Sequence, residues 1–210
     1  MQGQKFRWLV GAAIVAAGCA TSTTFKSTWR NPESRPAPLA GQKVVVLVIT
    51  TEDRTRRTSE DTVAAQITAR GVQGVSAWTI LPTADMRDEE KARTALAQSG
   101  AVAVVVMEIV PEDRSHRPVD FRGSMRSASN ISFWGNYRWA WGGAWYEGPP
   151  PSAGVFVETL VYSLQPDELV WAGRSRTVNP VGIPSVFAGV ATAVGEELER
   201  SGLLKGSGGE

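Results

Sequence analysis

Two runs of apolar, mostly β-branched residues limit the fold of this chain more than any other feature. They occupy residues 44–49 (VVVLVI) and 101–110 (AVAVVVMEIV). A strand that is apolar at nearly every position is typical of a sheet covered on both faces. Helical patterns at residues 59–70 and 85–99 flank a further strand at 72–81. The order β-α-β-α-β predicts parallel neighbouring strands with helical crossovers.

The C-terminal third of the chain predicts a different arrangement. Residues 154–164 and 169–178 form two strands in this interpretation, with Leu164 opposite Leu169 and a closing helix at 184–200. The fold class is therefore α/β, an α+β sandwich with a mixed sheet, a C-terminal β-hairpin and a final helix. One face of the hairpin and one stripe of the helix form the predicted core: Phe156, Leu160, Tyr162, Leu164, Leu169 and Trp171, with Val186, Val190, Val194 and Leu198.

The N-terminus has the three parts of a secretory signal peptide. A polar start with Lys5 and Arg7 precedes an apolar run at 8–17, and small residues lead to Cys19. The run is too short to span a bilayer as a helix. The segment resembles a bacterial lipoprotein signal, which implies a mature chain that begins at Cys19 with diacylglycerol and palmitate-type acyl chains. Residue 20 is Ala, whereas retention in the inner membrane would favour Asp at this position. By the same resemblance, Ala20 points to the outer membrane, with the domain facing the periplasm.

These features divide the chain into segments. We expect a signal peptide at 1–18, the lipidated Cys19 and a tether through residue 42, an α/β domain at 43–204 and a flexible tail at 205–210. Within the tether, residues 24–29 alternate weakly and predict an edge strand with Phe25 and Trp29 facing inward.

Composition excludes several classes of function. Twenty-two basic and 21 acidic residues give a formal net charge of +1, so no basic excess favours a nucleic-acid partner. A single Cys excludes an internal disulfide and a Cys-based zinc site, and a single His, His116, excludes schemes that need two. No cofactor or metal is expected.

An aromatic and glycine-rich insertion at residues 112–152 is the unusual part of the sequence. Odd-numbered positions from 119 to 125 and from 131 to 141 are mainly apolar, and residues 128–130 fit a three-residue turn. The pattern predicts a hairpin over 119–146 with one aromatic face and one polar face rich in Arg.

That aromatic face has three interpretations: a loop packed on the sheet, a surface for a protein partner, or membrane contact in a ring of subunits. Aromatic residues dominate binding hot spots. The candidate partner-binding residues are Phe133, Trp134, Tyr137, Trp139, Trp141 and Trp145.

Signals for catalysis are weak. The polar loop at 50–54 follows a parallel strand, where ligands often bind, but it also fits a helix entry. Glu108 and Glu158 lie in apolar strands, and Arg174 and Arg176 are expected to pair with them. Ser59 is the predicted N-cap of the first helix and has no His to activate it.

Several segments together resemble uncharacterised bacterial lipoproteins. The resemblance runs from Trp29 to Leu204 through TWRNP, VVVLVI, SEDTVAAQITARGV, AVAVVVMEIV and ETLVYSLQPDELVWAGRSRTVNP. More loosely, the layout is similar to the small α/β domains of the curli secretion-channel lipoprotein and of the TolB amino-terminal domain. Fold likeness alone does not imply function.

The sequence therefore favours a non-enzymatic lipoprotein, anchored in the membrane, that binds other envelope proteins. Two alternatives remain: a subunit of a homo-oligomeric outer-membrane export pore that uses the aromatic hairpin, and a periplasmic enzyme that uses the strand carboxylates.

Overall fold

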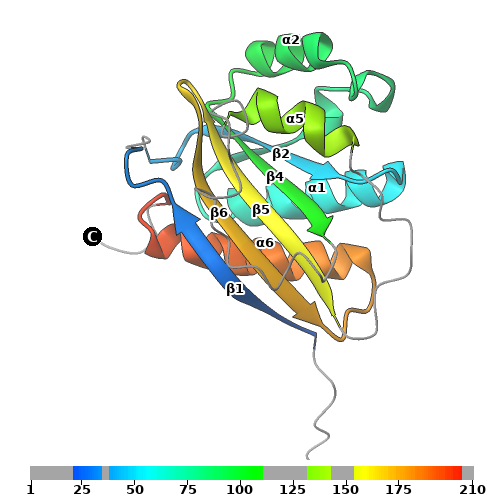
Figure 1. Ribbon diagram of the computed structural model, residues 1–210, viewed down its shortest axis with the longest axis vertical. Coiled ribbons are helices and arrows are strands. Elements are labelled where there is room, and N and C mark those ends of the chain that lie inside the picture. The colour runs from blue at the N-terminus through cyan, green and yellow to red at the C-terminus, as the bar shows by residue number, and fades with distance from the viewer. Residues whose placement is uncertain (1–20, 35–37, 111–131, 143–153, 205–210) are drawn as a thin grey trace, which may run out of the picture.

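A six-stranded mixed sheet organises the fold, in the order β1-β6-β5-β4-β2-β3 (Figure 1). The computed structural model describes residues 21–34, 38–110, 132–142 and 154–204. β2 is parallel to β3 and β4, and the remaining neighbours are antiparallel, which confirms the mixed α/β sheet. The strands are β1 (Ser22–Arg30), β2 (Lys43–Ile49), β3 (Gln73–Ser76), β4 (Ala103–Val110), β5 (Val155–Leu164) and β6 (Asp167–Val178).

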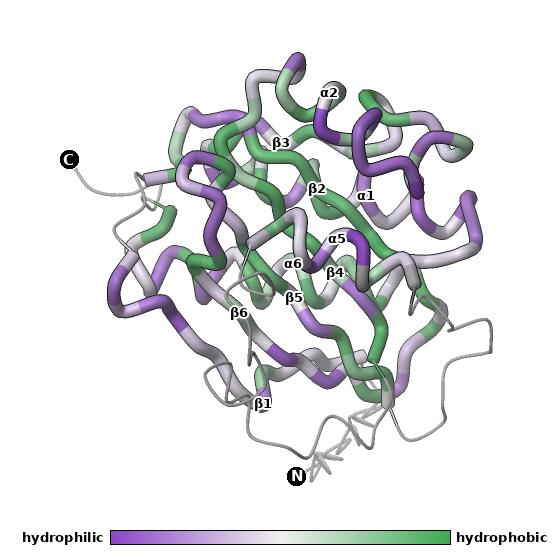
Figure 2. The backbone as a smooth tube through the Cα atoms, turned by 45° about the horizontal axis from the view of Figure 1, so that its top comes forward, coloured by the Kyte–Doolittle hydropathy of each residue, from purple (hydrophilic) through white to green (hydrophobic). Residues whose placement is uncertain are grey.

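Helices cover both faces of this sheet. α1 (Asp53–Thr68) and α6 (Ile183–Arg200) pack on one face, and α2 (Glu89–Ser99) and α5 (Phe133–Gly142) pack on the other. The residues of β2 alternate between the two cores: Val44, Val46 and Val48 face α1 and α6, whereas Val45, Leu47 and Ile49 face α2 and α5. This arrangement explains why residues 44–49 of the strand are all apolar. Figure 2 shows the apolar central strands between more polar outer segments.

α6 forms as its sequence predicts. Val186, Val190, Val194 and Leu198 are all buried against the sheet. Pro184 lies in the first turn, and Gly202 takes a positive φ of 74° just after the helix. A proline at the start and a glycine past the end are the expected boundary residues.

α1 begins at Asp53, so the prediction of a start at Ser59 is wrong. Glu52 caps the helix by accepting a hydrogen bond from the Thr55 backbone N–H. The first turns of this helix are polar, with no apolar residues at helical spacing around Arg56. Their sequence therefore resembles that of a loop. The Arg56 side chain is nevertheless only 1% exposed, since ion pairs to Asp53 and Glu60 hold both terminal nitrogens of its guanidinium. The predicted strand at 72–81 also ends early, at Ser76, and continues as a 3-10 turn at Ala77–Thr79.

The β5–β6 hairpin has a different register from the predicted one. Leu164 pairs with Asp167, and Tyr162 pairs with Leu169, so the turn is two residues long. A bulge follows in β6 and turns Trp171 to the α6 side, while Leu160, Tyr162 and Leu169 face α5. The prediction that Trp171 shares their face is therefore wrong, because the extra bulge residue reverses the alternation of sides.

The predicted second strand of the aromatic hairpin, residues 131–141, is wrong, because Phe133–Gly142 form a helix, α5. Phe133, Tyr137 and Trp141 are four residues apart, so they share one side of a helix as readily as one face of a strand. Residues 119–131, the other half of that hairpin, lie outside the described residues, as do Cys19, His116 and Trp145.

β1 is the edge strand that the sequence predicted inside the tether, and it spans Ser22–Arg30. A bulge between Phe25 and Ser27 puts the two inward aromatics on opposite faces: Phe25 contacts the core beneath α6, and Trp29 contacts the core beneath α5. A bulge with a central lysine, Lys26, is a common device that discourages another strand from pairing with an exposed edge.

A close approach at Gly173 generates a prediction about stability. The Phe25 and Trp171 rings meet edge to face, 5.7 Å apart, above this glycine. A Cβ at position 173 would lie 2.3 Å from the Trp171 Cη2 atom and 2.7 Å from the Phe25 ring. We expect Gly173→Ala to lower the free energy of unfolding by about 1–3 kcal/mol, because the rings must shift.

Chemical denaturation would measure this loss. Gly182→Ala is the matched control, because a Cβ there has its nearest neighbour at 3.9 Å and should change stability little. Equal stability of the two variants would contradict the packing described at Gly173.

Candidate interaction site and buried ion pairs

The polar loop after β2 is part of a closed ion-pair cluster. Arg56 Nη2 lies 3.0 Å from Asp53 Oδ1, and Arg56 Nη1 lies 3.4 Å from Glu60 Oε1. Thr83 accepts a further hydrogen bond from Arg56 and donates one to Asp53, which lowers the pKa of Asp53. The candidate ligand residues at 50–54 therefore serve as the helix entry, the second of the two interpretations.

Glu60 links α1 to β2 and to the 3-10 turn after β3 from the centre of that cluster. Its carboxylate accepts the Val48 N–H at 3.2 Å and the Trp78 N–H at 2.7 Å. Burial raises the pKa of Glu60 from 4.5 to about 7, and Arg56 and the two backbone N–H groups oppose that rise. The i, i+4 spacing of Arg56 and Glu60 was visible in the sequence, but their complete burial was not.

Glu158 has the partner that the sequence predicted. Arg174 Nη2 on β6 donates to Glu158 Oε1 on β5 at 2.9 Å, and the two residues are directly opposite in the sheet. Glu108 of β4 lies opposite Glu158 on the other side and also has an interaction partner. A carboxylate paired with a neighbouring guanidinium can be a purely structural ion pair, so this pairing alone does not indicate catalysis.

The candidate aromatic residues divide into two groups. Phe133 and Tyr137 are 1% and 3% exposed, and the Phe133 ring packs 5.7 Å from that of Tyr162. The Tyr137 hydroxyl donates to the Met86 carbonyl, and burial raises the pKa of Tyr137 to about 12. These two residues hold α5 on the sheet.

Trp134 and Trp141 are half-buried and pack at the margin of the same core. Trp134 lies under Arg93 of α2, whose guanidinium carbon is 4.1 Å from the ring centroid. The Trp139 side chain lies outside the described residues, as does Trp145. A role of these aromatics in partner binding stays a prediction.

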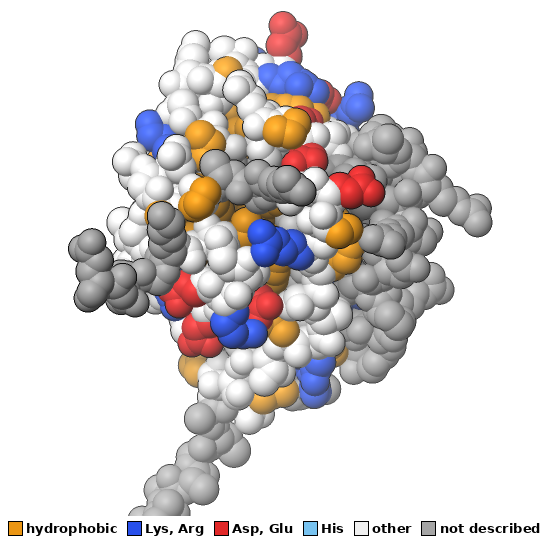
Figure 3. Space-filling view, turned by 90° about the vertical axis from the view of Figure 1, so that its left-hand side faces the viewer, with side chains coloured by type: hydrophobic (Ala, Val, Ile, Leu, Met, Phe, Trp, Pro, Cys, Tyr) orange, Lys and Arg blue, Asp and Glu red, His pale blue; other side chains and the backbone are white. Residues whose placement is uncertain are grey.

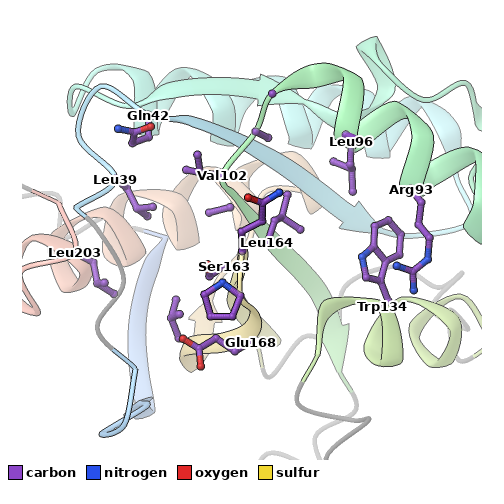
Figure 4. Close-up of a pocket in the computed structure, with 17 residues that line it drawn as sticks. Leu39, Gln42, Arg93, Leu96, Val102, Trp134, Ser163, Leu164, Glu168 and Leu203 are labelled. Atoms are coloured by element: carbon purple, nitrogen blue, oxygen red, sulfur yellow. The ribbon is translucent and has the colours of Figure 1, made fainter.

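An open groove of about 740 Å³ lies where β4 begins and the β5–β6 turn ends (Figure 4). Its lining is mainly apolar, and Val102 is 40% exposed there. Arg93 and Trp134 lie side by side at one end, and Leu39 and Leu203 lie at the other. Glu168 on the rim accepts a hydrogen bond from Ser34 at 2.6 Å.

The position of the groove favours a surface contact over small-molecule chemistry. It lies at the amino ends of the parallel strands β2 and β4, whereas ligands of open α/β sheets usually bind at the carboxyl ends. Its charged rim residues are already paired, Arg93 with Glu89 and Glu168 with Ser34. Among the described residues, no group of three His, Cys, Asp or Glu side chains could hold a metal ion.

The surface beside β1 has no extended patch of one charge. Figure 3 shows basic and acidic side chains interspersed with apolar ones on this side of the described structure.

The groove residues come from segments far apart in the chain, so no sequence motif indicated them. Only Trp134 of this set was a candidate from the sequence.

Comparisons with known proteins identify similarity of structure alone. No protein-family model and no curated protein sequence matches the chain. Two solved structures of PelC dodecamers from Paraburkholderia phytofirmans, one of them a point variant, have 15% and 17% sequence identity to it. The matches cover 88% and 84% of this chain and 98% and 95% of the PelC chains, each with a TM-score of 0.43. This similarity is too low to indicate a function, and the resemblance to uncharacterised lipoproteins stays a prediction.

The raised pKa of Glu60 generates a prediction about pH. Between pH 4.5 and about 7 the Glu60 carboxyl stays protonated in the folded protein, whereas in the unfolded chain it is ionised. The contribution of Glu60 to the free energy of unfolding is therefore fully present below pH 4.5 and is lost as the pH rises to about 7. Each pH unit is worth about 1.4 kcal/mol, so the free energy of unfolding should fall by up to about 3 kcal/mol between pH 5 and 8.

Glu60→Gln isolates this contribution, because the amide does not titrate. Urea denaturation of both proteins across this pH range should give a shallower decline for the variant. The two proteins should be similarly stable near pH 5, because the protonated carboxyl and the amide are both neutral there. Parallel pH profiles for the two proteins would show that Glu60 is ionised throughout.

Proposed function

We propose that this protein is a lipid-anchored envelope protein that acts by binding other proteins and not by catalysis. The observation behind the proposal is the position of the only cysteine, Cys19, which ends a signal-like segment two residues before Thr21 and the start of β1. A lipid on Cys19 would thus hold the sheet directly at the membrane. Two or three acyl chains give stable anchoring.

The described structure supports a binding role through its surface and its paired charges. The apolar groove with exposed Val102 suits a protein contact. Of the carboxylates considered for catalysis, Glu158 pairs with Arg174 of the neighbouring strand, and Glu108 also has an interaction partner. Within the described residues, no helix has the length and apolarity needed to cross a bilayer.

Cys19→Ser should abolish lipidation. We expect the wild-type protein to incorporate labelled palmitate and to sediment with membranes, and the variant to lose both properties because a hydroxyl at this position cannot form the thioether. Ala20→Ser is the matched control, which keeps Cys19 and should label normally. A density gradient would separate inner from outer membrane.

Two results would overturn the anchoring proposal. One is palmitate incorporation by the Cys19→Ser variant, and the other is wild-type protein that carries no lipid.

A second candidate is a subunit of an oligomeric outer-membrane export component. The groove is compatible with it for a geometric reason: a concave surface does not fit against itself, so a second copy bound there would fill it with a different surface. Such head-to-tail contacts can close into rings. The aromatic hairpin is no longer part of this candidate, because residues 133–142 form α5 on the sheet.

Particle mass tests the second candidate. If copies associate through the groove, purified protein in detergent should have a multiple of the 22.6 kDa chain mass, reduced by the removed signal peptide. Val102→Lys should shift the particles towards single copies, because a charge would be buried in the contact. Val181→Lys, at the opposite end of the sheet, should not. Light scattering that gives one copy for the wild-type protein would exclude self-association.

A further inference from the structure

Val181 is the most exposed large apolar residue that the structure describes. Its side chain is 90% exposed, in the loop that joins β6 to α6. The loop has the sequence NPVGIP at residues 179–184, which places two prolines, a valine and an isoleucine together without a charged residue. A single exposed apolar residue needs no explanation by itself, so its surroundings decide its meaning.

The loop lies beside the point where the chain enters the sheet. Ser22 of β1 pairs with Val178 at the end of β6, and the Thr21 hydroxyl donates to the Asn179 carbonyl at 2.8 Å. Figure 1 shows the start of β1 next to the arrowhead of β6. Cys19 is two residues before Thr21, which an extended chain spans in about 7 Å at most. Lipid on Cys19 would therefore lie close to this loop.

This end of the sheet is also poor in charge. Three segments meet there: residues 21–25 at the start of β1, 154–157 at the start of β5, and 177–195 from the end of β6 into α6. None of them contains Asp, Glu, Lys or Arg, although Arg176 of β6 lies at this end, opposite Thr24 and Phe156, with its guanidinium over the Phe156 ring. The opposite end of α6, by contrast, has Glu196, Glu197, Glu199 and Arg200. An uncharged loop such as residues 179–184 loses little hydration when it approaches the headgroup region of a bilayer.

We propose that residues 179–184, with Val181 at their centre, form a membrane-contact loop that inserts into the lipid surface next to the acylated Cys19. This inference rests on the proposed lipidation. One valine is too small to bind a membrane alone, so the lipid supplies the attachment and the loop sets the orientation. The strands then stand away from the bilayer, with the groove at their far end. That end is about 30 Å away, the length of a ten-residue strand such as β5.

A fluorescent label at position 181 tests the contact in the full lipidated protein. Lipidation consumes the Cys19 thiol, so Val181→Cys provides the only free thiol for an environment-sensitive dye such as NBD. Val102→Cys is the matched control, because Val102 is the other large hydrophobic residue that is exposed in the described part of the chain, and it lies at the groove end. Thermal unfolding checks that both labelled variants are folded.

The labelled proteins are reconstituted into vesicles of phosphatidylethanolamine and phosphatidylglycerol. We expect the dye at position 181 to shift its emission to the blue and to resist quenching by aqueous iodide, whereas the dye at position 102 should remain in water. A dye at 181 that stays quenchable in protein whose mass confirms the lipid would overturn the membrane-contact loop and leave the proposed function intact. Equal shifts at both positions would also overturn it, because the domain would then lie flat.

Mass spectrometry distinguishes failure of the proposed function itself. An unlipidated chain would have a free Cys19 and would accept a second dye on each variant. That result would overturn both the anchor and the loop contact that depends on it.

Discussion

The antiparallel pairing of β1 with β6 holds the N-terminal strand in the sheet and fixes where the chain enters it. It places Ser22 against Val178 and Arg30 against Trp171, so β1 runs along most of β6. The N-terminal entry, the loop before α6 and the start of β5 therefore meet at one end of the sheet. The β5–β6 turn and the groove lie at the other. The proposed attachment and the candidate binding surface are separated because this strand pair is continuous.

The parts of the fold that could be predicted from sequence are those in which one apolar pattern fits one structure. Residues 44–49 and 101–110 allow little but doubly covered strands, and the four-residue spacing from Val186 to Leu198 allows little but a helix. The spacing of Phe133, Tyr137 and Trp141 fits a helix and a strand equally well. The helix is favoured only in the folded protein, where Phe133 packs on Tyr162 and Tyr137 donates to the Met86 carbonyl. Arg56 shows a different limit, because a basic residue gives no sign of burial until its carboxylate partners surround it.

The candidate site was less accessible to sequence analysis than the fold. Leu39, Arg93, Val102, Trp134 and Glu168 meet only through the order of strands in the sheet. The two-residue turn and the bulge in β6 set the position of Glu168 and the side to which Trp171 points. Neither could be inferred from alternation, because a bulge reverses the pattern without changing the composition. Pairing of Glu158 with Arg174 could be anticipated, since adjacent strands with opposite charges favour it.

The orientation of β1 has a mechanical consequence under the proposed lipidation. A pull between the membrane and the domain would act on residue 19 and be transmitted along the axis of β1. Hydrogen bonds of an antiparallel pair run across that axis, so the load would shear the whole β1–β6 ladder at once instead of unzipping it bond by bond. Shear loading distributes the force over many hydrogen bonds, so β1 would be a mechanically stable connection between the membrane and the folded domain.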